Sequence, residues 1–154
     1  MKVTCSWQLR KKRAILNRRK LKDLIIAIAE LAGLELGADE VISVNFIGPR
    51  TMRRINREFL NHDYLTDVIC FNYKNDSAFS DNDIAVEIFI SPDIAEERAT
   101  DNPKLKYESE LLLYLVHAVL HAAGFKDKTP EDKKRMRRNE KRIINHSKII
   151  NFFQ

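Results

Sequence analysis

Two histidines four residues apart constrain this chain more than any other feature of its sequence. On a helix, His117 and His121 emerge from the same face, so both imidazoles point at one place. Gly124 follows three residues later, where a glycine ends a helix in the left-handed conformation, and the chain can then return Asp127 to the same place. Two imidazoles, one carboxylate and an open fourth position are typical of a catalytic zinc site, because closed structural sites usually use four Cys or His ligands. The sequence therefore predicts one zinc per chain at the end of a central helix.

Two alternatives to a catalytic zinc site remain at this point. A buried histidine pair can simply hydrogen-bond to backbone carbonyls, although the glycine and the acidic residue add constraints that a chance pair lacks. The spacing also equals that of the zincin proteases, His-Glu-x-x-His-x-x-Gly-x-x-His/Asp. Ala118 occupies the position of the protease's general base, which disfavours a metalloprotease. If Asp127 is not the third ligand, His62 or His146 has to be considered instead.

Composition predicts one soluble globular domain that spans residues 1–154. The chain is 44% hydrophobic and 32% charged, and its net charge of +5 suits a polyanionic partner. Cys5 and Cys70 match no metal-ligand spacing or disulfide framework, so we expect reduced thiols. The N-terminus lacks an apolar signal region, and the longest apolar run, near 111–125, is too short to span a membrane. We expect a cytoplasmic protein that does not contact membranes.

Hydrophobic periodicity predicts an α+β fold, with a small sheet of about four strands packed against about five helices. The expected strands are residues 3–7, 41–47, 66–73 and 84–90. The expected helices begin after Asn17, at 49, at 92, at about 104 and at about 130, and the first four end near 33, 60, 102 and 123.

Two predicted helices carry concentrated positive charge. Arg50, Arg53, Arg54 and Arg57 recur at helical spacing and form one stripe, and the last helix holds a second basic group between residues 133 and 142. A solvated face is one interpretation of the stripe. A phosphate-contacting surface is the other, because guanidinium groups match phosphate oxygens. The sequence does not decide between them.

Three segments together resemble the YbeY family of bacterial rRNA-maturation endoribonucleases. They are Thr66-Asp-Val-Ile-Cys-Phe71, Glu87-Ile-Phe-Ile-Ser91 and the segment from His117 to Asp127, and the similarity extends from Val41 to the last helix. The resemblance implies a mixed sheet with flanking helices. It also implies zinc-dependent cleavage of single-stranded RNA in small-subunit rRNA maturation and ribosome quality control. The implied partners are single-stranded rRNA and the small ribosomal subunit with its proteins, and we expect a monomer.

By the same resemblance, the candidate catalytic residues are His117, Glu87 and Asp67, although we favour a structural role for Glu87 over direct catalysis. Two positions depart from the family pattern. Asp127 replaces the usual third histidine, and Leu60 replaces an arginine found in many members. The first change adds a negative charge where the family has a neutral imidazole and the second removes a positive one, so the site is less positive and we expect weak nuclease activity in isolation.

Three questions stay open from the sequence. Arg57 is one residue that could supply the missing positive charge. The protein could also be a non-catalytic ribosome assembly factor with a structural zinc. Whether zinc or nickel is the native metal is likewise undecided.

Overall fold

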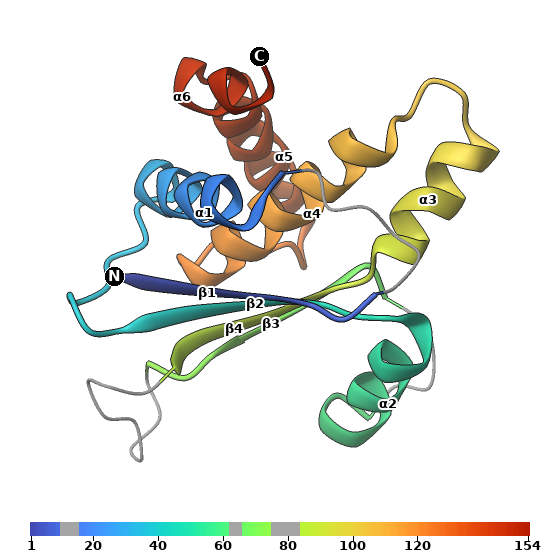
Figure 1. Ribbon diagram of the computed structural model, residues 1–154, viewed down its shortest axis with the longest axis horizontal. Coiled ribbons are helices and arrows are strands. Elements are labelled where there is room, and N and C mark those ends of the chain that lie inside the picture. The colour runs from blue at the N-terminus through green and yellow to red at the C-terminus, as the bar shows by residue number, and fades with distance from the viewer. Residues whose placement is uncertain (10–15, 62–65, 75–83) are drawn as a thin grey trace.

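The computed structural model describes residues 1–9, 16–61, 66–74 and 84–154, which form one four-stranded sheet flanked by helices (Figure 1). Strands and helices alternate as far as the third strand, the fourth strand comes next, and the later elements are helices. In chain order the elements are β1 (Lys2–Trp7), α1 (Arg18–Ala32), β2 (Val41–Phe46), α2 (Pro49–Phe59), β3 (Val68–Asn72), β4 (Ile84–Ile90), α3 (Pro92–Asp101), α4 (Tyr107–Ala122), α5 (Pro130–Ile144), α6 (Ser147–Ile150) and a final 3₁₀ turn (Asn151–Phe153).

The sheet is mixed, with strand order β1-β2-β4-β3. β1 pairs with β2 and β2 pairs with β4 in parallel, whereas β3 runs antiparallel to β4 and forms an edge of the sheet. The α+β class, the four strands and the mixed sheet expected from the sequence are thus confirmed. The expected bounds of β4 are matched at both ends, and the other strands differ from the expected bounds by one or two residues, most at β3, which begins at Val68 rather than 66.

The main core lies between one face of the sheet and α1, α4, α5 and α6 (Figure 1). Val86, Ile88 and Ile90 of β4 point into it and are fully buried. α2 packs on the opposite face at one end of the sheet, around a smaller cluster that contains Ile47, Met52, Ile55 and Ile69. α4 is therefore the central helix, and its buried side chains hold its polar positions in a defined place.

α4 begins three residues later than periodicity predicts. Asn102 forms a turn in which its carbonyl accepts from the Leu105 amide and its side chain accepts from the Lys104 amide. These bonds close a turn over residues 102–105, and the first residue of α4 is Tyr107. This shift leaves the histidine end of the helix unchanged.

The end of α4 is a Schellman turn centred on Gly124. Gly124 has φ +103°, its amide donates to the His121 carbonyl, and the Phe125 amide donates to the Leu120 carbonyl. The predicted left-handed glycine is confirmed, and the turn folds residues 125–127 back along the last turn of α4.

α5 begins with a capping box. The Thr129 hydroxyl accepts from the Asp132 amide, and the Asp132 carboxylate accepts from the Thr129 amide. The helix ends at Ile144, and His146 then caps α6 by accepting from the Lys148 amide through Nδ1. Among the described residues, none of the helices has the length and apolarity required to cross a membrane.

Candidate metal centre

Three ligand atoms converge where α4 meets the turn that follows it. His121 Nε2 lies 3.0 Å from His117 Nε2 and 3.2 Å from Asp127 Oδ2, and His117 Nε2 lies 3.4 Å from the same carboxylate oxygen. Ligand atoms placed 2.0–2.1 Å from a tetrahedral ion are about 3.3 Å apart. The three side chains are partly buried, with 25%, 30% and 41% of the His117, His121 and Asp127 side chains exposed. The structure thus brings together the three residues that the spacing predicts.

The hydrogen-bond partner of Nδ1 determines which nitrogen of each imidazole carries the proton. His121 Nδ1 lies 2.9 Å from the Phe125 carbonyl, which can only accept, so Nδ1 donates. His117 Nδ1 lies 2.8 Å from Glu140 Oε1 and donates to that carboxylate. In the neutral imidazoles both Nε2 atoms then carry lone pairs.

The consequence is that two nitrogen lone pairs and a carboxylate oxygen face one another without a donor between them. Such an arrangement is unfavourable unless a proton or a cation lies among the three atoms. A divalent ion fits the donor set, since imidazole and carboxylate are both zinc ligands and each histidine has the outer hydrogen bond that usually orients a metal-bound imidazole. The group formed by His117, His121 and Asp127 can therefore hold a metal ion.

Glu140 is the member of this arrangement that sequence patterns did not reveal. It lies on α5, 23 residues from His117, and 13% of its side chain is exposed. Burial opposes the charge on His117, but the hydrogen bond and charge of Glu140, together with Asp127 and Asp67, raise the pKa of His117 above its ordinary value. Glu140 is the single acid within the basic run at residues 133–142 of α5, and this is the sequence signal that could have drawn attention to it.

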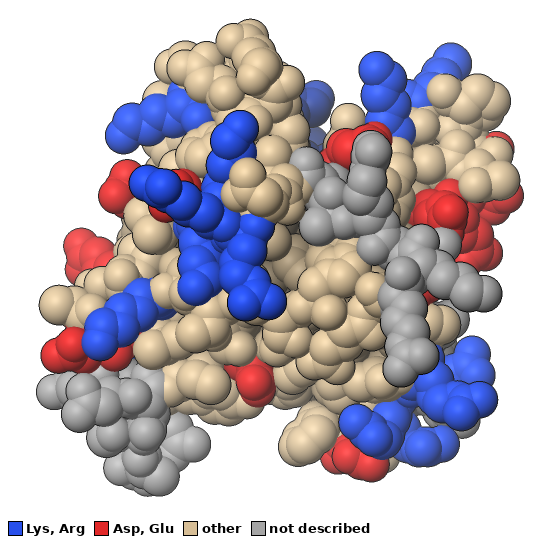
Figure 2. Space-filling view, viewed as in Figure 1, with Lys and Arg blue, Asp and Glu red and all other residues tan. Residues whose placement is uncertain are grey.

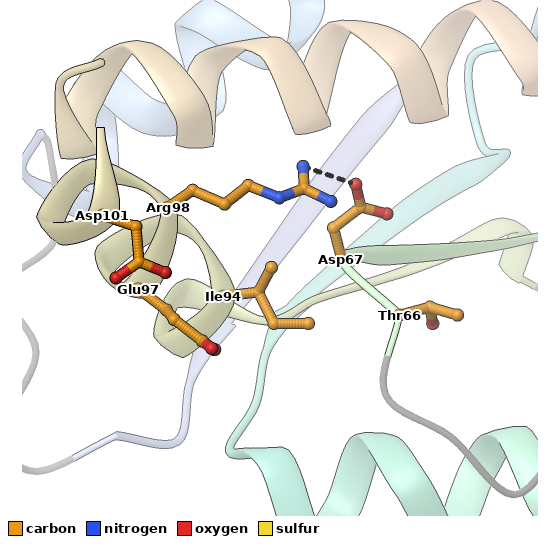
Figure 3. Close-up of a pocket in the computed structure, with 6 residues that line it drawn as sticks. All are labelled: Thr66, Asp67, Ile94, Glu97, Arg98 and Asp101. Carbon is orange, nitrogen blue, oxygen red and sulfur yellow. Dashed lines mark hydrogen bonds and ion pairs between the residues drawn. The ribbon is translucent and has the colours of Figure 1, made fainter. Parts of the chain in front are cut away.

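Asp67 lies beside the metal group and pairs with α3. Its carboxylate is 3.2 Å from Arg98 Nη1, and Arg98 also donates to the Tyr114 hydroxyl, one turn before His117 on α4. Figure 3 shows Arg98 reaching across from α3 to Asp67. A pocket of about 530 Å³ opens at this pair. Its lining residues are Thr66, Asp67, Ile94, Glu97, Arg98 and Asp101.

Glu87 is placed away from the three ligand atoms. It alternates with the core residues Val86 and Ile88 on β4, so its side chain projects from the sheet face opposite α4. There it accepts a 3.0 Å hydrogen bond from the Tyr73 hydroxyl. Ala118, by contrast, is fully buried and brings no carboxylate to the histidines, consistent with the argument against a protease.

The arginine stripe is exposed on α2, and Figure 2 shows the Lys and Arg side chains gathered over this helix at the lower right. Leu60 caps the same helix and is 39% exposed. Some cations of α5 have structural partners: Arg135 lies over the Phe125 ring, and Arg142 donates to the Leu31 carbonyl. His146 is used as a helix cap, and His62 lies outside the described residues.

Fold and site together define an α+β protein in which two histidines and an aspartate at the end of the central helix can hold a metal ion. Residues 6–148 match the family model described as Endoribonuclease YbeY, and the chain belongs to this family. The predicted family is confirmed.

Two curated relatives show the extent of the match. Endoribonuclease YbeY of Chlorobium phaeovibrioides is 36% identical over 133 residues, which cover 86% of this chain and 83% of the relative. Endoribonuclease YbeY of Chlorobium luteolum is 39% identical over 126 residues, 80% of this chain and 87% of the relative. The solution structure of TM1509 from Thermotoga maritima is 22% identical, with a TM-score of 0.58 over 99% of this chain and 95% of the other, and is similar in fold.

Proposed function

We propose that this protein is a zinc-dependent endoribonuclease that cleaves single-stranded RNA in the maturation and quality control of the small ribosomal subunit. The observation that carries the proposal is the convergence of two imidazole nitrogens and a carboxylate oxygen within 3.4 Å of one another. The names of the relatives supply the class of substrate. We further propose that residues 1–154 act as one domain, in the cytoplasm and as a monomer, on the small subunit and its proteins.

In this proposal His117, His121 and Asp127 hold one zinc ion. A bound zinc supplies a nucleophile at neutral pH by lowering the pKa of a water ligand, and it polarises a phosphoryl oxygen. Glu140 and the Phe125 carbonyl keep the two rings oriented through their Nδ1 protons. Asp67, which pairs with Arg98 at the edge of the neighbouring pocket, would orient groups that approach His117.

Glu87 has a structural role in this proposal. Its carboxylate accepts from Tyr73 on the sheet face opposite α4, which suits packing of β3 against β4 rather than proton transfer at the metal. The exposed arginines of α2 (Arg50, Arg53, Arg54 and Arg57) would contact RNA phosphates.

Metal content and cleavage after loss of one ligand test the proposal. Protein purified without added metal should hold one zinc per chain, and Asp127→Ala should lose both the zinc and the cleavage of a single-stranded RNA. Asp23→Ala is the matched control, since that aspartate is exposed on α1 and lies outside the ligand group. Retention of zinc by Asp127→Ala at the wild-type level would reject Asp127 as a ligand.

A second candidate function rests on the position of Glu140. Because this residue joins α5 to the metal group on α4, a bound zinc would also hold the last helices together, as a structural zinc in an assembly factor would. The two functions separate in His121→Ala: a folded variant that binds small subunits and supports their maturation, although it cannot cleave RNA, would favour the assembly factor.

A further inference from the structure

The sheet face opposite α4 carries a row of aromatic side chains. Phe71 of β3 and Tyr73, the residue after this strand, project from this face, and their rings are nearly parallel, at 9° with centroids 6.0 Å apart. Phe59, at the end of α2, meets Phe71 edge-on at 5.9 Å, and Phe89 of β4 meets it at 6.1 Å. The row therefore runs from the end of α2 along β3.

Core packing accounts for only part of this row, because Phe71 and Phe89 pack against the small cluster beneath α2. Phe59 is 66% exposed, and Phe71, Tyr73 and Phe89 are only partly buried. Among the described residues, α2 is the helix that packs on this face, and it covers one end of the sheet around Ile47 and Ile69 (Figure 1). Apolar rings are thus presented to solvent beside that helix.

The surroundings of the row are positively charged and polar. The helix that ends in Phe59, Pro49–Phe59, contains four arginines and a single acid, Glu58. Next to the rings, Tyr73 donates to Glu87, and Asn45 donates to the Ser43 hydroxyl. Burial, followed by the hydrogen bond and charge of Glu87, raises the pKa of Tyr73 to about 12, so its hydroxyl stays a donor at neutral pH. Exposed rings beside a cationic helix are complementary to the bases and phosphates of a single-stranded nucleic acid.

The same strand also lies beside the metal group. Asn72 of β3 donates to the Ala122 carbonyl at the end of α4, and Asp67, just before β3, is close enough to influence the pKa of His117. Because β3 is an edge strand, its outer side joins the two faces of the sheet. RNA that lies on the aromatic face can continue over this edge toward the ligand atoms.

We propose that Phe59, Phe71 and Tyr73 form a stacking platform for the bases of single-stranded RNA, whose phosphates are contacted by Arg53, Arg54 and Arg57. This inference rests on the proposed ribonuclease function and adds the surface that holds the substrate. Glu87 lies at the platform and offers a carboxylate to exocyclic amino groups, which cytosine and adenine carry and uracil lacks. The platform therefore favours oligocytidine over oligouridine.

The test measures RNA binding separately from cleavage. Metal-free protein is titrated into fluorescein-labelled oligocytidine or oligouridine, and anisotropy gives Kd at several salt concentrations. Phe59→Ala should weaken binding by about 5- to 150-fold, the loss of one base stack, and should leave the slope of log Kd against log salt unchanged. Phe59→Trp should restore binding. Phe153→Ala is the matched control, because Phe153 is an exposed phenylalanine (42%) at the other end of the chain.

Other outcomes reject the platform in distinguishable ways. Wild-type affinity in Phe59→Ala, with weakened binding in Arg57→Glu, would overturn the stacking platform and leave the proposed function intact. If Phe59→Ala bound RNA as the wild type does but no longer bound isolated small subunits, the face would be assigned to a protein partner and the platform would be overturned. If the wild-type protein bound neither oligonucleotide, the platform and the proposed function would both fall.

Discussion

Removing Glu140 should weaken zinc binding, although this residue does not touch the metal in the proposed site. Its carboxylate accepts from His117 Nδ1 at 2.8 Å, and 13% of its side chain is exposed. A hydrogen bond to a charged group contributes about 1.5–3 kcal/mol, which equals about 10- to 150-fold in affinity. The His117 side chain is 25% exposed. Residues that hydrogen-bond to metal ligands usually change metal affinity by about 10- to 100-fold. Both points favour the lower part of this range.

Two substitutions separate charge from hydrogen bonding in this prediction. Glu140→Gln keeps an acceptor for Nδ1 and loses the charge, so we expect about a tenfold loss of affinity. Glu140→Ala removes both and should approach a hundredfold loss. Competition with a chromogenic zinc chelator at neutral pH measures both values, and Glu131→Gln, an exposed acid in the first turn of α5, is the control. Wild-type zinc affinity in Glu140→Ala would refute the argument that this residue orients the imidazole.

Three further predictions follow from the charges and burial of named residues. Arg53→Glu combined with Arg57→Glu should weaken binding to all single-stranded RNA sequences alike, as measured by anisotropy. The slope of log Kd against log salt should fall by about 0.7 for each phosphate that the variant no longer neutralises. A slope equal to that of the wild type would reject α2 as a phosphate-binding surface. Leu60→Arg should raise RNA cleavage by the isolated protein, because it adds a cation at the end of α2, the helix whose arginines are proposed to contact RNA phosphates; a rate that stays the same or falls would show that another cation already acts. Burial raises the pKa of Cys70 to about 12. Because only the thiolate reacts, Cys70 should react slowly with a disulfide reagent at about pH 8 and faster as the pH rises or when the protein is unfolded; rapid labelling of the native protein would contradict its burial.

The sequence predicted the parts of the site that lie close together along the chain. The i, i+4 spacing of His117 and His121 and the glycine that ends α4 are local features, so helix geometry alone places both rings and returns Asp127 to them. The mixed four-stranded sheet followed from hydrophobic alternation together with the family resemblance.

Contacts between distant segments could not be predicted in the same way. Glu140 reaches His117 only because α5 packs against α4, and no sequence spacing encodes that packing. α4 starts later than expected, after a turn at Asn102 that hydrophobic periodicity does not register. The aromatic row became visible only when the sheet order placed β3 at an edge, beside the end of α2.

Zinc titration with RNA cleavage as the readout tests the central claim most directly. Protein stripped of metal with a chelator should be inactive toward single-stranded RNA, and activity should return in proportion to added zinc and level off at one equivalent per chain. His121→Ala, which removes one of the three converging ligand atoms, should show no recovery at the same zinc concentrations. Cleavage that persists in the stripped protein, or that His121→Ala recovers as fully as the wild type, would contradict the account.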